Sequence, residues 1–477
     1  MKSKNKKQNI YLIGIKGVGM TMLAQFLREK GNNVCGSDVT DTFLTDRVLK
    51  KEKIKVFSPF NAKNISDNPD LIIHSSAFTA KNNPEMAAIE DNPERFNKIP
   101  IISYAEALGG VFNDYYGIAV CGSHGKTTTS AWLGYVLNKA GKSPSVLVGS
   151  RVPQFNGSSL LGKSKYFVAE VDEYQNKLQY FNPFGVVLNN IEFDHPDFFK
   201  DQVAYTKVFA DFIKKIPREG FLVVNNRDGE INKIKKYGGG QIITYDVAGS
   251  GETVPTVNYL ATDLKMKNGY QYFSVNDWGE FKISLWGKHN VFNALAVIAA
   301  ARALKVSIPD IKKHLAGFKG TERRAQILGK YKGALIIDDY AHHPTEVKAT
   351  LEGIRAREIK KNLITVFHPH TFTRTKALFK DFVVSFALTD ELIILDIYGS
   401  AREKQGGVSS KQLVSEIIKY NKKYQIKQSV KSIATIPQAA EYLKKRLSQK
   451  DVLLLMGAGD VFRIGNDLLD SGKNKKK

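Results

Sequence analysis

Residues 116–142 read YGIAVCGSHGKTTTSAWLGYVLNKAGK and carry the most informative pattern of the chain. The short apolar run at the start is typical of a buried strand, and the stretch at the end has the character of a helix. Between them lies a glycine-rich turn that ends in Lys126 and Thr127, as loops that bind phosphate groups do. The loop is shorter than usual, because only two residues separate Gly122 from Gly125. A strand, a phosphate-binding loop and a helix together predict a nucleotide-binding α/β domain.

Short apolar strands alternate with helical stretches on both sides of this segment, which predicts parallel sheets covered by helices. The chain has 477 residues, enough for about three domains of ~150 residues each. We expect a Rossmann-like N-terminal domain over 1–112, a central P-loop ATPase domain over 113–320 and a Rossmann-like C-terminal domain over 321–477. The expected strands fall within residues 10–15, 33–37, 55–58, 71–76, 116–123, 166–173, 184–195, 220–226, 333–340, 362–369, 390–398 and 451–460.

The composition is that of an ordinary globular protein, with 43% hydrophobic and 25% charged residues. No apolar run approaches the roughly 18 residues of a transmembrane helix. The N-terminus passes from basic residues straight into a short strand and lacks the features of a signal peptide. Two cysteines, Cys35 and Cys121, provide neither a disulfide framework nor a CxxC metal site. We therefore expect a cytoplasmic protein that does not contact a membrane.

The net charge of +23, from 70 Lys and Arg against 47 Asp and Glu, indicates a negatively charged ligand. Such a charge suits nucleic acid, and it equally suits an enzyme with polyanionic small substrates. The basic interior segments lack regularly interleaved aromatic residues, so a solvated surface is the better interpretation. We expect no nucleic-acid partner, and a nucleic-acid-binding P-loop ATPase remains the distant alternative.

A second glycine-rich turn lies near the N-terminus, in GIKGVGM at residues 14–20. It places Gly14, Gly17 and Gly19 between an expected strand and an expected helix, where backbone N–H groups can face a diphosphate. Asp38 follows at the end of the next strand, where a ribose hydroxyl would lie. Because the spacing is GxxGxG rather than GxGxxG, the turn favours a nucleotide diphosphate without specifying a nicotinamide one. A purely structural turn stays open as an alternative.

Acidic residues gather at the ends of two strands in the central block. Carboxylate and phosphate oxygens are the ligands that Mg²⁺ prefers, so a magnesium site beside the P-loop is expected. A histidine in such a cluster is unusual for Mg²⁺, and a capping or packing role for it stays open. For Asp172 and Asp194 a capping or solvated role is at least as well supported as a metal role. The cluster consists of Glu170, Asp172, Glu173, Glu192, Asp194, His195 and Asp197.

Eight of the nine histidines lie at or near expected strand ends or in glycine-rich turns, where the ligand crevice of an α/β enzyme forms. Arg374 lies in an expected loop near the carboxyl end of a strand. An arginine there suits bidentate binding of a carboxylate or phosphate, and a surface ion pair is the alternative. The eight histidines are His74, His124, His195, His289, His342, His343, His368 and His370.

Taken together, six motifs resemble the Mur ligases of peptidoglycan synthesis, in the same order and over nearly the whole chain. They are GSHGKTTT, EVDE, NNIEFDH, GKHNVFNALA, GTERR and DDYAHHPTEVKATL. The resemblance implies an ATP-dependent, amide-forming enzyme of cell-wall biogenesis. Its implied reaction joins L-alanine to the lactyl carboxylate of UDP-N-acetylmuramate through an acyl phosphate, with ATP and two Mg²⁺ ions. We expect a monomer or weak dimer.

The resemblance also implies roles for individual residues. For ATP they are Gly122, Ser123, His124, Gly125, Lys126, Thr127, Thr128, Asn290, Asn293, Arg324 and Asp339. For the UDP-sugar they are Gly14, Gly17, Gly19, Asp38, His74, Ser75 and Ser76. For the amino acid they are His342, His370 and Arg374. For the metal they are Thr127, Glu173 and His195, and those implied to be catalytic are Lys126, Glu173, His195 and Arg324.

One alternative within the family stays open. EVDEYQNK and LNNIEFDHPDFF are also similar to murein peptide ligase, a recycling relative that attaches a whole peptide. The stretch PHTFTRT at residues 369–375 favours an enzyme that accepts a single amino acid.

Overall fold

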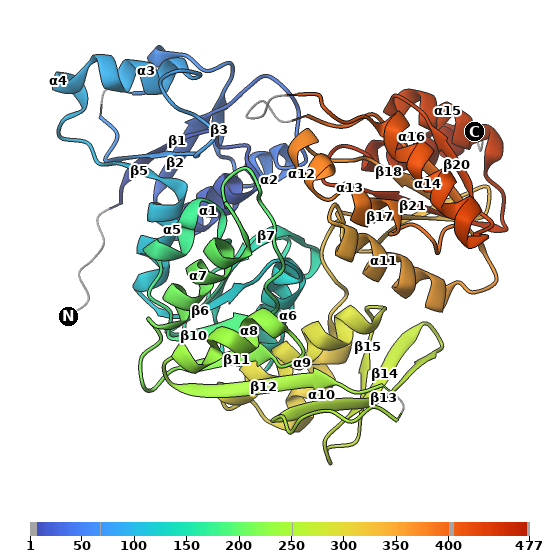
Figure 1. Ribbon diagram of the computed structural model, residues 1–477. Coiled ribbons are helices and arrows are strands. Elements are labelled where there is room, and N and C mark those ends of the chain that lie inside the picture. The colour runs from blue at the N-terminus through green and yellow to red at the C-terminus, as the bar shows by residue number, and fades with distance from the viewer. Residues whose placement is uncertain (1–6, 67, 250, 400–404, 475–477) are drawn as a thin grey trace. The chain divides into compact units, whose positions relative to one another are not determined.

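The computed structural model describes residues 7–66, 68–249, 251–399 and 405–474. Contacts divide the chain into two compact units, each built from three segments. Unit 1 comprises Met1–Ile191, Thr206–Tyr245 and Ala296–Phe318, and unit 2 comprises Glu192–Tyr205, Asp246–Leu295 and Lys319–Lys477. Three β-sheets, each accompanied by helices, confirm the predicted α/β fold class (Figure 1). The predicted domain borders at residues 112 and 320 stay a prediction.

The first sheet of unit 1 is entirely parallel, in the order β3-β2-β1-β4-β5. Because the chain runs from β1 to β2 on one side and places β4 on the other, the carboxyl end of β1 is a topological switch point, where such sheets bind ligands. The strands are β1 (Asn9–Ile13), β2 (Asn33–Ser37), β3 (Lys55–Phe57), β4 (Leu71–His74) and β5 (Ile101–Ser103). The helices are α1 (Val18–Glu29), α2 (Asp46–Lys51), η1 (Ala62–Asn64), α3 (Pro84–Asp91), α4 (Pro93–Phe96) and α5 (Tyr104–Asn113).

The central strands of unit 1 run in the order β12-β11-β10-β6-β9-β7-β8, and only β8 is antiparallel to its neighbour. The P-loop follows β6, so it lies between the carboxyl ends of β9 and β10. The strands are β6 (Tyr116–Cys121), β7 (Ser145–Val152), β8 (Gly157–Leu160), β9 (Tyr166–Glu170), β10 (Gly185–Leu188), β11 (Phe221–Asn225) and β12 (Gln241–Val247). The helices of this part are α6 (Lys126–Lys139), η2 (Pro153–Phe155), η3 (Tyr174–Tyr180), α8 (Gly229–Ile234), η4 (Lys235–Tyr237) and α10 (Ile308–Gly317). Two further helices, α7 (Gln202–Ile213) and α9 (Lys288–Ala303), begin in segments of unit 2 and continue into unit 1.

Aromatic packing joins the first sheet of unit 1 to its central sheet. The ring of Phe167 in β9 packs edge-on against Phe26 of α1, with centroids 5.3 Å apart, and against Phe112 of α5, at 5.8 Å. The side chain of Gln25 accepts a hydrogen bond from the backbone N–H of Ser158 at 3.2 Å. This buried junction fixes the N-terminal glycine turn relative to the strands that carry the P-loop.

Unit 2 contains an antiparallel β-meander and a six-stranded sheet in the order β16-β17-β21-β18-β19-β20. Within this six-stranded sheet only β16 is antiparallel to its neighbour, and apolar clusters cover both faces of the sheet. The strands are β13 (Tyr259–Lys267), β14 (Tyr270–Val275), β15 (Glu280–Ile283), β16 (Gln326–Tyr331), β17 (Ala334–Asp339), β18 (Asn362–Phe367), β19 (Glu391–Ile394), β20 (Ser429–Ser432) and β21 (Asp451–Met456). The helices are α11 (Pro344–Arg357), α12 (Phe372–Ala377), α13 (Phe379–Val383), α14 (Ser410–Tyr424), α15 (Ile436–Arg446) and α16 (Phe462–Asn474).

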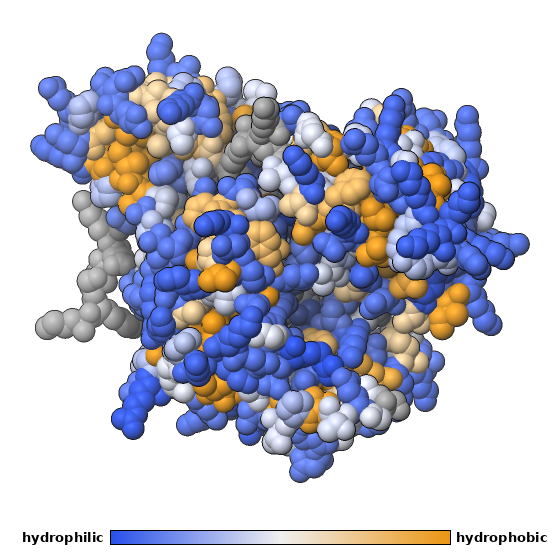
Figure 2. Space-filling view, viewed as in Figure 1, coloured by the Kyte–Doolittle hydropathy of each residue, from blue (hydrophilic) through white to orange (hydrophobic). Residues whose placement is uncertain are grey.

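None of the helices in the described ranges is long and apolar enough to cross a membrane. Figure 2 shows hydrophilic residues over most of the face in view, with hydrophobic residues in scattered patches.

Candidate active site

The N-terminal glycine turn folds as the sequence predicted. Gly14 has a φ of +84°, and a Cβ atom there would lie 2.6 Å from the ring of Phe78, so only glycine fits. A Cβ atom on Gly19 would lie 2.8 Å from the ring of Tyr104, so this glycine lets α1 approach α5. Gly17 has an ordinary φ and marks the start of α1.

Asp38 lies beneath this turn and holds its shape. The carboxylate accepts hydrogen bonds from the backbone N–H groups of Lys16 at 2.6 Å and Val39 at 2.8 Å. Burial raises the pKa of Asp38, although these N–H groups favour the ionised form. The turn after β4 reaches the same edge, because His74 pairs with Ile13 of β1. The structure therefore brings together all the residues predicted for the UDP-sugar: Gly14, Gly17, Gly19, Asp38, His74, Ser75 and Ser76.

The P-loop wraps tightly around the start of α6. Gly122 has a φ of +117°, and a Cβ atom there would lie 2.6 Å from the carbonyl oxygen of Asn190. The ammonium group of Lys126 turns back over the loop and donates to the carbonyl oxygens of Gly122 at 2.6 Å and Ser123 at 3.1 Å. The loop therefore presents backbone N–H groups and one cation at a helix N-terminus, an arrangement suited to phosphate.

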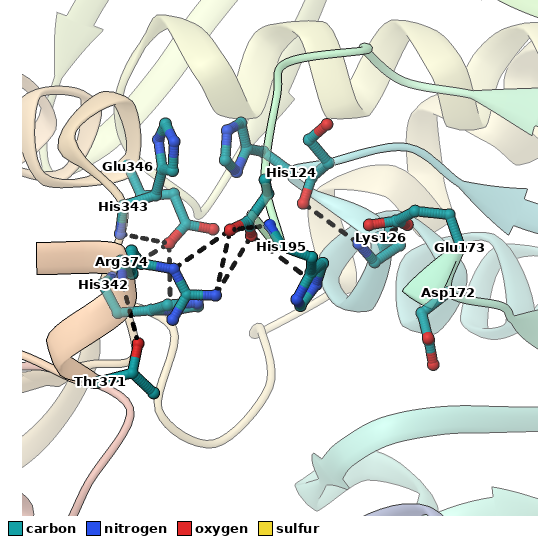
Figure 3. Close-up of polar contacts among 12 residues, drawn as sticks. His124, Lys126, Asp172, Glu173, His195, His342, His343, Glu346, Thr371 and Arg374 are labelled. Atoms are coloured by element: carbon teal, nitrogen blue, oxygen red, sulfur yellow. Dashed lines mark hydrogen bonds and ion pairs between the residues drawn. The ribbon is translucent and has the colours of Figure 1, made fainter. Parts of the chain in front are cut away.

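Two carboxylates from the end of β9 meet this loop. Glu173 is 1% exposed, and its Oε2 lies 3.6 Å from Nζ of Lys126 (Figure 3). Glu170 accepts a hydrogen bond from the hydroxyl of Thr127 at 2.7 Å and from the backbone N–H of Gly149 at 2.7 Å. Asp172 instead pairs with Lys177 at 2.8 Å. The hydroxyl and carboxylate oxygens at this point are the donor set that fits Mg²⁺.

Sequence reasoning missed the two residues that hold the loop in place, Asn189 and Asn190. The Asn190 side chain accepts from the backbone N–H of His124 at 2.7 Å and donates to its carbonyl oxygen at 3.1 Å. Asn189 donates to the same carbonyl at 3.2 Å and to the hydroxyl of Thr129 at 3.2 Å. The available signal was a pair of amide side chains directly after a strand that neighbours the P-loop strand.

A buried ion pair forms the core of the candidate site in unit 2. The Nε of Arg374 donates to Oδ1 of Asp194 at 3.1 Å, and its Nη2 donates to Oδ2 at 3.4 Å. Arg374 was expected in a loop, but it lies in the first turn of α12, whose N-cap residue Thr371 accepts from its backbone N–H (Figure 3). Burial opposes ionisation of Asp194, yet Arg374, followed by His195 and His342, holds the pKa of this carboxyl well below its usual range.

Two predicted histidines lie around this ion pair. His342 is mostly buried, and its Nδ1 lies 3.0 Å from the carbonyl oxygen of Tyr340 and 3.3 Å from Oε2 of Glu346 (Figure 3). Burial lowers the pKa of His342 to about 3, so the ring is neutral near pH 7. The ring of His370 lies 6.4 Å from that of His342 and stacks on Tyr398 at 5.6 Å.

The remaining predicted residues of unit 2 lie on α9 and around β17. The side chain of Asn290 donates to the carbonyl oxygen of Trp286 at 2.7 Å, and Asn293 donates to Asn290 at 3.1 Å. Both carboxylate oxygens of Asp339 accept backbone N–H groups, from Ala325 and Ala341. The two bonds to Asp339 fix the backbone just before β16 and just after β17, at one end of this strand pair.

Neighbouring arginines hold different positions in this part of unit 2. The guanidinium of Arg324 lies 5.2 Å from the ring of Tyr340. Arg323, which sequence reasoning did not select, pairs with Asp338 at 3.2 Å and donates to the carbonyl of Gly457 at 2.7 Å. Arg323 therefore ties the start of the C-terminal sheet together, which leaves Arg324 as the arginine of this pair that is suited to a ligand.

Comparisons with known proteins agree with this arrangement. Three family models match: the Mur ligase family catalytic domain over 9–116, the Mur ligase middle domain over 120–301, and the Mur ligase glutamate ligase domain over 323–459. The UDP-N-acetylmuramate–L-alanine ligase of Caldanaerobacter subterraneus is 36% identical over 98% of both chains. That of Clostridium kluyveri is 38% identical over 97% of both chains.

Solved structures agree on the fold. The UDP-N-acetylmuramate–alanine ligase of Thermotoga maritima superposes with a TM-score of 0.80 at 24% identity, covering 98% of this chain and 100% of that one. The murein peptide ligase of Psychrobacter arcticus gives 0.70 at 24% identity, covering 98% and 99%. Since three family models together span most of the chain and relatives match it almost end to end, this chain belongs to the Mur ligase family.

Proposed function

We propose that this chain is the ATP-dependent ligase that joins L-alanine to the lactyl carboxylate of UDP-N-acetylmuramate, a step in the synthesis of peptidoglycan precursors. The observation that carries the proposal is the full-length similarity, at 36–38% identity, to ligases that bear this name. The local geometry supports it, because the P-loop, its carboxylates and the N-terminal glycine turn lie at the carboxyl ends of parallel strands in unit 1.

The chemistry proceeds in two steps. A lactyl carboxylate oxygen attacks the γ-phosphorus of ATP, the bond to ADP breaks, and an acyl phosphate forms. The neutral amine of L-alanine then attacks the carbonyl carbon, and inorganic phosphate leaves as the amide forms. The first step brings two anions together, so the cation of Lys126 and the loop N–H groups are needed to offset their repulsion.

For the phosphates we assign Gly122, Ser123, His124, Gly125, Lys126, Thr127 and Thr128. Mg²⁺, when bound, would neutralise phosphate charge, and its proposed ligands are Thr127 and Glu173 for one ion and His195 for a second. Support comes from the oxygen-rich donor set around Thr127. Asn290 and Asn293 are proposed to face adenine, Arg324 the phosphates and Asp339 the ribose.

The first sheet is proposed to bind the UDP-sugar through Gly14, Gly17, Gly19, Asp38, His74, Ser75 and Ser76. The switch-point position of this turn supports the assignment. The amino acid is proposed to lie among His342, His370 and Arg374, because Arg374 provides a cation in a buried setting beside a neutral histidine. We also propose a cytoplasmic location, a monomeric or weakly dimeric state and no nucleic-acid partner.

The test is ADP release by the purified full-length protein with ATP, Mg²⁺ and UDP-N-acetylmuramate, using L-alanine, glycine, L-serine and a cell-wall tripeptide as acceptors. We expect the highest kcat/KM with L-alanine. A preference for the tripeptide would assign the chain to peptide recycling, and ADP release that depends on nucleic acid would refute the ligase assignment.

A further inference from the structure

Arg374 and Asp194 form a buried pair whose geometry leaves one side of the guanidinium unused. Both residues are only 7% exposed. The contact uses Nε and Nη2, at 3.1 Å and 3.4 Å from the two carboxylate oxygens. Nη1 donates to no residue in the described ranges. An arginine can bind one carboxylate along each of two edges, and here the protein occupies only one of them.

Backbone strain accompanies both partners of this pair. His195, directly after Asp194, has a φ of +56°, and its N–H donates to Oδ1 of Asp194 at 2.7 Å. Thr371, the N-cap of the helix that carries Arg374, has a φ of +70° and a ψ of 136°. Positive φ is uncommon outside glycine, although histidine adopts it more often than most residues, and it is a genuine outlier for a β-branched residue. Such strained residues gather at functional sites.

Stability alone does not explain the pair. Replacing a buried ion pair with apolar residues of similar volume is often neutral or stabilising. A fold that keeps two buried charges, and strains the backbone beside each of them, maintains a defined orientation of the guanidinium rather than a gain in stability.

We propose that Asp194 is a positioning residue for the amino-acid substrate. It holds the Nε–Nη2 edge of Arg374, so that the remaining side of the guanidinium is fixed in the direction from which the carboxylate of L-alanine arrives. This inference rests on the proposed function, in which Arg374 binds that carboxylate. Asp194 acts through Arg374 and does not itself contact the reacting atoms.

The same contact has a competing interpretation, in which Asp194 stands in for the substrate carboxylate and must be displaced by it. The burial of Asp194 and its second bond, from the N–H of His195, argue against displacement. A carboxylate expelled from Arg374 would stay buried without its cation, which is strongly unfavourable. The two interpretations predict opposite changes in the KM for L-alanine.

The experiment measures steady-state kinetics of the full-length wild type, Asp194→Asn, Arg374→Lys and the double variant, with each substrate varied in turn. Asp194→Asn is expected to raise the KM for L-alanine about tenfold to a hundredfold, the range found when a partner that orients a metal-binding side chain is removed. The KM values for ATP and UDP-N-acetylmuramate and the Mg²⁺ requirement should change much less. Because both single changes act through one guanidinium, their effects on the KM for L-alanine should not multiply in the double variant.

Asp451→Asn is the matched control. Asp451 is 2% exposed and lies 3.5 Å from Arg446, so it is also a buried aspartate paired with an arginine in unit 2. This variant should keep the wild-type KM for L-alanine. If Asp194→Asn does not yield folded protein, Asp194→Glu keeps the charge, displaces the carboxylate by one methylene and permits the same comparison.

Four results would overturn the inference: an unchanged KM for L-alanine, a lowered one, an equal rise in the KM for ATP, or effects that multiply in the double variant. A lowered KM would identify Asp194 as a competitor of the substrate. An inactive wild type would refute the proposed function and the inference with it. An active wild type with an unchanged Asp194→Asn variant would refute the inference alone.

Discussion

Replacing Asn190 with alanine should loosen the P-loop without removing any group expected to touch ATP. The substitution deletes two hydrogen bonds to the backbone of His124, at 2.7 Å and 3.1 Å, and keeps the backbone bond from Ser123 at 3.1 Å. Each bond contributes roughly 0.5–1.5 kcal/mol net, so the ordered conformation of the loop should lose about 2 kcal/mol of stability. ATP must restore that order on binding, and its apparent affinity should fall roughly thirtyfold.

The assay compares the KM for ATP in ADP release with the thermal protection given by ATP and Mg²⁺. The KM for L-alanine should stay close to the wild-type value. The matched control is Asn232→Ala, which deletes one 2.7 Å bond to the carbonyl oxygen of Asn226 on the exposed surface of α8. An Asn190→Ala enzyme with a wild-type KM for ATP would mean that the loop is held by its own backbone, and that Asn190 does not organise the loop for ATP.

Four further predictions follow from single residues or ligands. Lys126→Ala should lower kcat by about 3 kcal/mol or more of transition-state stabilisation, the loss expected for one preorganised donor; near-normal turnover would exclude the P-loop assignment. UDP-N-acetylmuramate should raise the melting temperature by binding the folded state, and NAD should not; protection by NAD alone would mean that the turn at Gly14 binds a dinucleotide. Arg374→Lys should raise the KM for L-alanine about tenfold to a hundredfold, equivalent to about 1.5–3 kcal/mol, because lysine lacks the fork geometry of arginine. A rise in the KM for ATP alone would assign Arg374 to the nucleotide site. Burial lowers the pKa of His289 to about 4. The neutral ring therefore contributes roughly 3 kcal/mol to the free energy of unfolding above pH ~6.5, and this contribution is lost as the pH falls toward 4. In urea unfolding, the stability of His289→Gln should decline less steeply over this range than that of the wild type, and parallel curves would show that His289 is not the titrating group.

The parallel strands were predictable because each is a short apolar run followed by glycine or polar residues. Residues 116–123, 166–173 and 333–340 all contain a strand in the structure, and Pro344 begins α11 as a helix-starting proline should. The antiparallel β13–β15 meander was missed, although Asn268-Gly269 between two alternating segments is a strong hairpin signal. Both residues have positive φ, at +51° and +76°. Reading the chain for helix and strand alternation alone passed over this turn.

The part of the site in unit 1 was largely predictable, because the strands of a parallel sheet have their carboxyl ends at the same edge. A polar residue directly after an apolar strand, such as Glu170 or Asp38, can therefore be placed at the ligand edge from local sequence alone. What such residues do at that edge was not predictable. Asp38 uses both carboxylate oxygens to hold a turn, and Glu170 accepts from a P-loop threonine rather than standing free for a ligand.

The site in unit 2 shows a different limit, since its central contact joins residues 180 positions apart. Sequence pattern can say that Asp194 follows one strand and that Arg374 lies near the carboxyl end of another, but not that their side chains share one buried space. Pairing decides the chemistry here: an exposed Arg374 would bind any anion weakly, whereas a buried, half-occupied guanidinium can fix one carboxylate in one orientation. The cost is visible in the strained backbone of His195 and Thr371. Local conformational preferences disfavour the backbone at both residues. A prediction from those preferences therefore fails at this site, where the fold accepts backbone strain to hold a defined substrate geometry.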